Sequence, residues 1–359
     1  MTKHIVLAIP SLQAGGMERV MTEVANFLVK KSHYRVTLVL YGINREIFYK
    51  IDPNICVVKP NFTFDNNKRF LSTLKTLFFL RKTFHRLKPY RILSFGEFWN
   101  NFVMLSVLGT KHEVILSDRS QPDKSLGAFQ EWLRKKLYPI SYGIIAQTIK
   151  ALEIYQNKYD HSNIQVIGNP IRSILAKDLP RENVIVSVGR LIKSKNHDAL
   201  IRIFSKLKRA ENWRLIIVGY DHLKQQNQVN LEALAAELGL KERVEFAGKQ
   251  KDVESYYLRS KIFAFTSSSE GFPNVLGEAM SAGLPVISYD CVAGPSDLIE
   301  DGKNGFLVPL FDEEAYVLKL QLMIDSPIIL SEMSKSSLLK IKQFEPNSIC
   351  EKFEDFLMK

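Results

Sequence analysis

The chain has 359 residues, of which 46% are hydrophobic and 24% charged, so it has an ordinary globular composition and the length of about two domains. This composition argues against a wholly disordered chain, a collagen-like fibre and a disulfide-rich miniprotein. The formal charge is +11, and it is uneven: residues 1–170 hold 24 basic and 12 acidic side chains, whereas residues 171–359 hold 25 and 26. The two halves are therefore expected to face different partners.

The cysteines and the apolar runs narrow the class of protein. Cys56, Cys291 and Cys350 form no CxxC pair, which argues against a zinc site and favours a reducing compartment. No stretch reaches the roughly 18 apolar residues that span a bilayer, and the apolar run near the N-terminus is too short for a secretory signal. We expect a cytosolic protein, or one that touches a membrane from outside.

Short β-branched runs alternate with longer amphipathic segments throughout the chain. This alternation is typical of parallel, doubly wound sheets, so each half is predicted to be a Rossmann-like α/β domain. Strands are expected at 4–9, 35–41, 55–58, 91–94, 113–117 and 143–146, and then at 184–188, 214–218, 244–247, 262–265 and 285–288. Helices are expected at 18–31, 198–210, 230–238, 253–259 and 275–282, among others.

The domain boundary is placed at a short segment with two prolines, residues 169–181. Residues 1–170 form the predicted N-terminal domain and 171–344 the C-terminal one. A last helix at about 345–359 is expected to pack back on the first domain. Two such domains facing each other leave a central cleft beside the carboxyl ends of their strands, where open α/β sheets bind ligands.

The first expected strand leads into the turn PSLQAGGMER. Gly15 and Gly16 would let the backbone approach a ligand closely, and Glu18 begins the following helix. A pair of glycines at a helix entry can equally serve the conformation of the turn alone.

The basic excess is concentrated between Asn66 and Gly96, where eight basic residues and no acidic one alternate with apolar residues. A helix around 67–91 could place the apolar residues on one stripe and the bases on another, as helices at anionic membrane surfaces do. The segment 132–138, with Arg134, Lys135 and Lys136, is expected to extend this face. The alternative is a core-facing helix with a solvated basic side. No nucleic-acid-binding motif accompanies the charge, so nucleic acid is not an expected partner.

Two segments of the second half carry the sharpest chemistry. In VGRLIKSKN, residues 188–196, Arg190 and Lys195 follow a strand and offer a planar fork and a mobile point charge to a diphosphate. In EGFPNVLGEAMSAGLPVI, residues 270–287, a Gly-Phe-Pro turn leads into a helix between Glu270 and Glu278. Turn amides and the positive end of the helix dipole make an anion site between two carboxylates that can bind diols. A sugar nucleotide requires this combination.

Each of these residues also has a purely structural interpretation. Arg190 and Lys195 could belong to a solvated basic turn, Glu270 could cap the helix, and Glu278 could be a solvated helical residue. A third segment, GPSDLIEDGKNGFLVP at 294–309, is interpreted as glycine-rich loops without direct chemistry.

Taken together, GRLIKSKN, EGFPNVLGEAMSAGLPVI and DGKNGFLVP resemble the C-terminal half of retaining glycosyltransferases of family 4, which have the GT-B fold. The turn GGMERV and the chain length fit the same family. The resemblance implies that Arg190 and Lys195 bind the donor diphosphate, that Glu278 binds the ribose and that Glu270 contacts the donor hexose. It also implies two sets of backbone contacts to the donor, from Gly15 and Gly16 and from Gly271, Phe272, Pro273, Asn274 and Val275. The loop 248–252 would lie near the nucleobase.

The segment ILSDRSQP, residues 115–122, occupies the place where many relatives have a histidine near the donor sugar. Here Asp118 and Arg119 stand instead, so a mechanism based on histidine does not transfer. Arg119 is a candidate for holding the donor or acceptor sugar. The alternative is a surface arginine paired with Asp118 or Asp123.

The sequence thus predicts a GT-B enzyme that transfers a hexose or N-acetylhexosamine from a UDP-sugar with retention, without a cofactor or an essential metal. The expected acceptor is a glycan, lipid-linked or soluble, and most simply a polyprenyl diphosphate sugar at the inner face of a bacterial cell membrane. The alternatives are a GT-B sugar-nucleotide epimerase or hydrolase and a non-catalytic membrane-associated subunit that binds sugar nucleotides.

Overall fold

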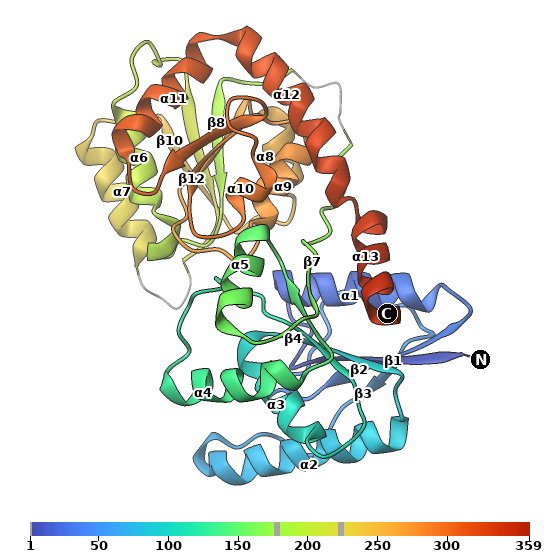
Figure 1. Ribbon diagram of the computed structural model, residues 1–359. Coiled ribbons are helices and arrows are strands. Elements are labelled where there is room, and N and C mark those ends of the chain that lie inside the picture. Colours follow the sequence, from blue (N-terminus) through green and yellow to red (C-terminus); the bar gives the residue numbers. More distant parts are fainter. Residues whose placement is uncertain (1, 176–179, 222–225) are drawn as a thin grey trace. The chain divides into compact units, whose positions relative to one another are not determined.

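In the computed structural model, which describes residues 2–175, 180–221 and 226–359, the chain divides into two compact units. Unit 1 consists of residues 1–170 and 346–359, and unit 2 of residues 171–345. Part of the predicted linker 169–181, residues 176–179, lies outside the described residues. Both units are α/β structures built on one parallel sheet, as the alternation of strands and helices predicts (Figure 1).

Unit 1 has a seven-stranded parallel sheet in the order β3-β2-β1-β4-β5-β6-β7. Its strands are β1 (Lys3–Ile9), β2 (Tyr34–Leu40), β3 (Cys56–Val58), β4 (Arg91–Phe95), β5 (Val114–Ser117), β6 (Gly143–Ala146) and β7 (Ile164–Val166). Its helices are α1 (Gly16–Val29), α2 (Arg69–Leu87), α3 (Glu97–Val107), α4 (Ala128–Leu137) and α5 (Ile149–Lys158), with short 3-10 turns η1 (Asn66–Lys68) and η2 (Tyr138–Ile140). The last helix, α13 (Pro346–Met358), packs against α1 and completes unit 1.

Unit 2 has a six-stranded parallel sheet in the order β10-β9-β8-β11-β12-β13. Its strands are β8 (Val184–Val188), β9 (Arg214–Val218), β10 (Val244–Gly248), β11 (Ile262–Phe265), β12 (Val286–Asp290) and β13 (Gly305–Pro309). Its helices are α6 (His197–Ser205), α7 (Asn227–Glu237), α8 (Glu254–Arg259), α9 (Asn274–Ser281), α10 (Pro295–Leu298), α11 (Glu313–Asp325) and α12 (Pro327–Ile341). The 3-10 turns η3 (Lys193–Lys195) and η4 (Lys342–Phe344) complete it.

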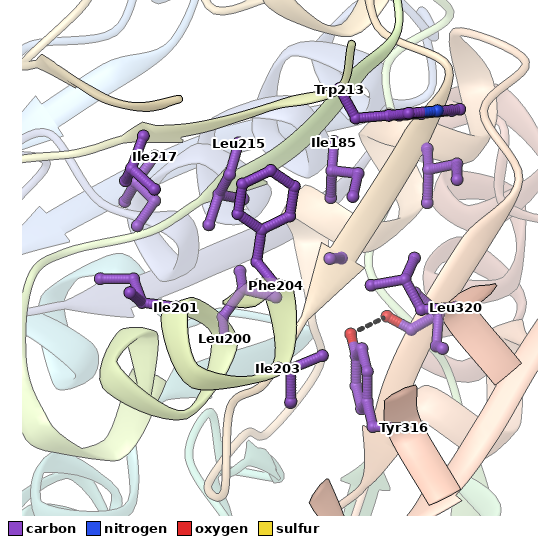
Figure 2. Packing of buried hydrophobic residues seen from close by; sticks show 14 of the residues in the cluster. Ile185, Leu200, Ile201, Ile203, Phe204, Trp213, Leu215, Ile217, Tyr316 and Leu320 are labelled. Atoms are coloured by element: carbon purple, nitrogen blue, oxygen red, sulfur yellow. Dashed lines mark hydrogen bonds between the residues drawn. The ribbon is translucent and has the colours of Figure 1, made fainter. Parts of the chain in front are cut away.

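The sheet of unit 2 is buried on both faces, because successive residues of its strands enter opposite hydrophobic clusters. Ile185 belongs to the cluster under α6 and α11, whereas Val184 and Val186 belong to the cluster on the other face. Figure 2 shows the first cluster, in which Tyr316 stands among the aliphatic side chains. Its hydroxyl donates to the Ile287 carbonyl at 2.9 Å and accepts from the Phe265 amide at 3.1 Å. This buried phenol therefore links β11 to β12 without an unsatisfied polar group.

Two strands were not predicted. The segment 305–309 was expected to be a loop because it is glycine-rich, but it forms the edge strand β13 beside β12. A Cβ at Gly305 would lie 2.1 Å from the Val286 carbonyl oxygen, so this glycine serves the close approach of two strands. The other unpredicted strand, β7, has only three residues.

Candidate functional site

The sheet of unit 2 has a topological switch point between β8 and β11. The chain passes from β8 outward to β9 and β10, and then returns to continue on the other side of β8 with β11, β12 and β13. Ligands of open α/β sheets bind at the carboxyl ends of the strands beside such a point. The two predicted motifs follow these two strands: Arg190 and Lys195 follow β8, and Glu270 follows β11.

Lys195 and Glu270 meet across this switch point. The Lys195 ammonium lies 2.5 Å from Glu270 Oε1, and the two side chains are 16% and 13% exposed. The ammonium also lies 5.2 Å from the centre of the Phe265 ring, at the end of β11. Glu270 is therefore not a helix cap, and Lys195 is not a freely solvated base.

Hydroxyl side chains hold the turn that carries Lys195. Thr266 Oγ1 donates to the carbonyl of Lys195 at 2.9 Å, and the Ser268 amide donates to the carbonyl of Ser194 at 2.8 Å. Asn196, in the left-handed conformation at φ 49°, donates from its side chain to the carbonyl of Thr266 at 2.9 Å. These positioning residues were missed in the sequence. Their signal is the run TSSS directly before Glu270, which supplies short polar side chains at the end of a buried strand.

Arg190 is different from Lys195, because its side chain is exposed and has no hydrogen bond or ion pair among the described residues. Its loop is nevertheless fixed by the neighbouring strand end. A Cβ at Gly219, which follows β9, would lie 1.8 Å from the Gly189 carbonyl oxygen, so only glycine allows these loops to approach. Arg190 is thus an exposed cation, unpaired among the described residues, on a loop whose backbone is fixed by Gly219.

The N-terminus of α9 is the third part of the site. The helix begins at Asn274, as expected, and its N-cap residue Pro273 makes no side-chain capping bond. The turn before it is held by the loop after β12, because a Cβ at Gly294 would lie 2.3 Å from Pro273 Cδ. Gly271, Phe272 and Pro273 are buried in this turn. The positive end of this helix dipole therefore lies beside Glu270 in the chain.

Glu278 lies in the second turn of α9 and is held by a buried phenol. Its Oε2 accepts a hydrogen bond from Tyr257 at 3.3 Å, and its Oε1 lies 4.0 Å from Arg172 Nε. Burial, and then the charge of Glu278, raise the pKa of Tyr257 well above its ordinary value, so the phenol keeps its proton and donates. Glu278 is consequently an oriented carboxylate, not the freely solvated residue of the structural alternative.

Two buried groups near the site were not predicted. Burial, followed by the charge of Lys195, lowers the pKa of His197 to about 4, so its imidazole is neutral at pH 7. Burial, followed by the charge of Glu270, raises the pKa of Cys291 to about 12, so its thiol stays protonated. Neither group brings charge to the switch point at neutral pH, where Lys195 and Glu270 form their ion pair.

Unit 1 has its own switch point, between β1 and β4. Gly15 and Gly16 follow β1 there, where the sequence placed a ligand turn. Tyr49 fixes this turn, since its hydroxyl accepts from the Gly15 amide at 3.0 Å and donates to the Gly15 carbonyl at 2.8 Å. Glu97, directly after β4 and Gly96, accepts from Ser120 Oγ at 2.6 Å and was missed in the sequence.

Arg119 points into unit 1. Its Nη1 donates to Asn169 Oδ1 at 2.8 Å, and its guanidinium stacks 3.7 Å from the centre of the Phe95 ring. Burial lowers the pKa of Arg119 to about 9. The alternative ion pairs are not formed, because Asp118 binds Arg134 and Asp123 accepts from Gln121 at 2.7 Å. A direct contact of Arg119 with a sugar stays a prediction.

The prediction that Arg134 extends a basic surface is wrong. Arg134 is 2% exposed and forms a buried ion pair with Asp118. Asp118 also accepts from Tyr138 at 2.5 Å and from Asn100 at 3.0 Å, and Glu131 accepts from Arg134 at 3.0 Å. Arg134 is therefore part of the polar core between α3 and α4, where its charge is compensated.

Helix α2 was expected either to separate an apolar stripe from a basic stripe or to face the core with a solvated basic side. Its structure differs from both. Its buried face consists of Ser72, Thr76, Leu80, Thr83 and Phe84. Small hydroxyl residues can be buried here because the backbone supplies hydrogen-bond partners. Thr76 Oγ1 donates to the Ser72 carbonyl at 2.9 Å, and Ser72 Oγ donates to the Asp65 carbonyl at 3.2 Å. The exposed face consequently mixes bases with large apolar side chains, which include Phe70, 74% exposed, and Phe78, 69% exposed.

Two further findings concern the described residues. Within the described ranges, no three side chains of His, Cys, Asp or Glu form a group that could hold a metal ion. Among the helices of those ranges, none is long and apolar enough to cross a membrane.

Comparisons with known proteins identify the family of the chain. The family model described as "Glycosyl transferases group 1" matches residues 172–338, and "Glycosyltransferase Family 4" matches residues 14–173. An uncharacterized glycosyltransferase of Haemophilus influenzae is 31% identical over 96% of both chains. A Campylobacter jejuni α-1,4-N-acetyl-D-galactosaminyltransferase, named for an undecaprenyl diphosphate-linked glycan, is 27% identical over 97% of this chain and 96% of the relative.

Solved structures show the same fold. HepE of Anabaena in complex with UDP has a TM-score of 0.83 at 18% identity, covering 99% of this chain and 100% of HepE. The lipopolysaccharide outer core galactosyltransferase WaaB has a TM-score of 0.79 at 22% identity, covering 99% of both chains. The chain belongs to the family 4 glycosyltransferases with the GT-B fold, which confirms the resemblance seen in its motifs. Glycosyl transfer is therefore its class of function.

Proposed function

We propose that the protein transfers a hexose or N-acetylhexosamine from a UDP-sugar, with retention of configuration, to a polyprenyl diphosphate-linked glycan. The observation that carries the proposal is the contact between Lys195 and Glu270 at the switch point of unit 2. It joins a phosphate-binding cation to a sugar-binding carboxylate, and a sugar nucleotide places its diphosphate directly next to its sugar.

Each part of the site has a role in this proposal. Arg190 and Lys195 bind the diphosphate, and the Glu270 carboxylate binds hydroxyls of the sugar. Glu278, held by Tyr257, accepts from the ribose hydroxyls. The amides of residues 271–275 lie against the sugar and the phosphates. For Gly15 and Gly16, contact with the donor stays a prediction.

Retention follows if the acceptor attacks on the face that the diphosphate leaves. The negative charge that develops on the leaving group is stabilised by groups whose positions are already fixed. Thr266 holds the turn of Lys195, and the contact of Gly294 with Pro273 holds the N-terminus of α9. The departing phosphate takes the proton of the acceptor hydroxyl, which fits the neutral states of His197 and Cys291. No metal is needed in this scheme, since the cations are side chains.

The acceptor is the part of the proposal that rests on relatives and on surface charge. The similar protein of Campylobacter jejuni is named for an undecaprenyl diphosphate acceptor. The mixed basic and apolar face of α2 suits the anionic inner surface of a cell membrane, where such an acceptor is found. We place the enzyme there as a peripheral protein.

The experiment is a panel of UDP- and other nucleotide sugars offered to the full chain with a short polyprenyl diphosphate-linked sugar in detergent, followed by mass spectrometry. A product heavier by one sugar residue from one UDP donor, with NMR showing that the anomeric configuration is retained, supports the proposal. Release of free sugar with no product, or a changed sugar nucleotide, would instead support the hydrolase or epimerase alternative. The same reaction run with EDTA tests metal independence, which full inhibition would contradict.

A further inference from the structure

Unit 1 contains an apolar groove that the proposed chemistry does not use. It lies between α2, α3 and α4 and has a volume of about 630 Å³, within the range of small-molecule sites. Figure 1 shows these three helices together on one side of unit 1. The lining is mainly aromatic, and it includes Phe64, Phe70, Trp99, Phe102 and Phe129. A ligand of this groove must therefore be largely apolar.

The protein does not cover this groove with its own described side chains. Phe70, Phe98 and Phe129 line it and are also exposed large hydrophobic residues. Contiguous exposed apolar surface of this kind marks a binding site in soluble proteins. Two polar residues of the lining are held by their neighbours, since Asn101 donates to Gln130 Oε1 at 2.7 Å and Thr76 to the Ser72 carbonyl. They leave the aromatic rings as the main contact surface.

One end of the groove is cationic. Arg69 belongs to its lining, is exposed, and has no ion pair or side-chain hydrogen bond within the described ranges. It is the second of the eight bases that occur without an acidic residue between Asn66 and Gly96. The groove thus matches an amphiphile that has an apolar chain and a strongly anionic head.

The same end lies at the ligand-binding edge of the sheet. Helix α2 connects β3 to the parallel strand β4, so its first residue, Arg69, lies toward the carboxyl edge of the sheet. Gly42, also in the lining, donates to the carbonyl of Pro10 directly after β1, at 2.7 Å. A Cβ at Gly96, directly after β4, would lie 3.0 Å from the Trp99 ring. A head group at this end would therefore lie on the side of the sheet where the turn of Gly15 and Gly16 stands.

From this arrangement we infer that the groove binds the isoprenoid chain of the acceptor, with Arg69 binding its diphosphate. The inference deepens the proposed function and rests on it for the identity of the lipid. A diphosphate fits the surplus of bases better than the single phosphodiester charge of a bulk phospholipid. The methyl-branched chain offers the aromatic walls a wider surface than an unbranched acyl chain does.

The test is the titration of geranylgeranyl diphosphate into the full chain in buffer without vesicles or detergent, below the micelle concentration, measured by calorimetry. Dodecyl phosphate and inorganic diphosphate are the comparison ligands. We expect geranylgeranyl diphosphate to bind at least about tenfold more tightly than either, because it alone fills both parts of the site.

A matched pair of variants separates the groove from the general exposed surface of α2. Phe70 lines the groove and Phe78 does not, yet both are exposed phenylalanines of the same helix. Phe70→Ser should weaken the binding of geranylgeranyl diphosphate about tenfold, whereas Phe78→Ser should leave it within about twofold. Arg69→Gln should weaken geranylgeranyl diphosphate and inorganic diphosphate alike. Thr73→Trp, which fills the groove from α2, should abolish binding of the chain while the melting temperature stays the same.

Equal binding by the Phe70 and Phe78 variants would overturn the inference, and so would equal affinity for dodecyl phosphate and geranylgeranyl diphosphate. Because no sugar nucleotide is present, this result is separate from the fate of the proposed function. A protein that binds geranylgeranyl diphosphate in the groove but transfers no sugar to a lipid-linked acceptor supports the groove and contradicts the proposed reaction. If the protein transfers the sugar but Phe70→Ser leaves its affinity for geranylgeranyl diphosphate unchanged, the result supports the proposed reaction and contradicts the groove.

Discussion

The ammonium of Lys195 and the carboxylate of Glu270, 75 positions apart in the chain, form an ion pair between the loops that follow β8 and β11. The pair spans the point where the strand order of unit 2 reverses. Before a donor binds, each charge compensates the other in a mostly buried setting. In the proposed reaction, the diphosphate of the donor would compete for Lys195 and free Glu270 for the sugar, so the pair would couple the binding of the two parts of the donor.

The first prediction concerns Glu270. Glu270→Ala should lower the rate of transfer by at least about 100-fold, because an oriented polar contact to the reacting sugar is lost. The affinity for UDP should stay equal or rise, since Lys195 no longer has a competing carboxylate. Transfer is measured by mass spectrometry and UDP binding by calorimetry, with Glu314→Ala, in the first turn of α11, as the control. Normal turnover in Glu270→Ala would show that the site is elsewhere.

The second prediction contrasts the two cations. Lys195→Ala and Arg190→Ala should each reduce transfer by about two to three orders of magnitude, because both stabilise the leaving diphosphate. Their effects on folding should differ. Arg190 is exposed and unpartnered among the described residues, so its loss should change the free energy of unfolding by less than about 0.5 kcal/mol. Lys195→Ala leaves Glu270 without its partner and should destabilise the protein by more than that.

Urea denaturation of the two variants, followed by circular dichroism, measures this difference. Arg190→Ala serves as the control for Lys195→Ala, because both changes remove one positive charge from the same loop. Equal stabilities would mean that the ion pair with Glu270 contributes nothing to folding. Unchanged UDP affinity in both variants would contradict the role assigned to these cations.

The sequence predicts those features of the site that follow from local patterns of strands and helices, but not those that depend on contacts between distant segments. Strand-and-helix alternation places the loops of Arg190 and Glu270 at the same edge of one sheet, and this was predicted. The same pattern cannot show which side chains meet, so the hydroxyl residues Thr266 and Ser268 that hold the Lys195 turn were missed. At Gly305 the glycine led to the wrong prediction of a loop, because in the sequence a glycine required by the close approach of two strands cannot be told from a loop glycine.

Arg134 illustrates a second limit. Its neighbours in sequence, Lys135 and Lys136, are exposed, so local charge alone assigns all three to one basic surface. The partner that buries Arg134 is Asp118, at the end of β5, and no helical or strand spacing connects the two. A buried ion pair between distant segments is visible only after the helix is packed on the sheet.

This pair gives the third prediction. Asp118→Asn should lower the free energy of unfolding by about 3–5 kcal/mol, because it leaves the buried Arg134 with only part of its compensation. Asp325→Asn is the matched control, since Asp325 pairs with the exposed Arg209 and its loss should cost at most about 1 kcal/mol. Urea unfolding at pH 7 compares them. Similar costs for the two variants would contradict a structural role of the buried pair.

The fourth prediction follows from the neutral imidazole of His197. Its pKa is lowered from 6.5 to about 4 by burial and then by the charge of Lys195, against the weaker opposing effects of the Arg190 backbone and of Asp198. Between these pH values the unfolded chain binds a proton that the folded chain does not. The contribution to stability is therefore complete above about pH 6.5 and is lost as the pH falls toward 4, with a slope of at most about 1.4 kcal/mol per pH unit.

His197→Leu should flatten this dependence, because it removes the imidazole whose protonation causes it. Urea midpoints at pH 5 and pH 7 measure the slope for the protein and the variant. His85→Gln, a change at an exposed position of α2, is the control and should leave the slope as it was. An unchanged slope in His197→Leu would assign the acid sensitivity to other groups.

The last prediction concerns the proposed membrane surface of α2. Arg81 is a poor choice for a charge variant, because it donates to the carbonyls of Ser106 at 3.2 Å and Leu108 at 2.8 Å at the end of α3. Lys75, Lys82 and Arg86 are exposed and have no such bonds within the described chain, so we choose them. Changing these three to Gln should weaken flotation with anionic vesicles by at least about tenfold, since each base near the surface contributes about 1 kcal/mol.

The matched control changes three exposed lysines of unit 2, Lys208, Lys241 and Lys335, to Gln, which removes the same charge from elsewhere. Its flotation should stay close to that of the unchanged protein, and both variants should keep their activity on a short acceptor in detergent. High salt should release the unchanged protein, because the attraction of exposed charges is screened over about 8 Å at physiological ionic strength. Equal flotation of the two triple variants would show that net charge, and not the face of α2, directs the protein to the vesicle.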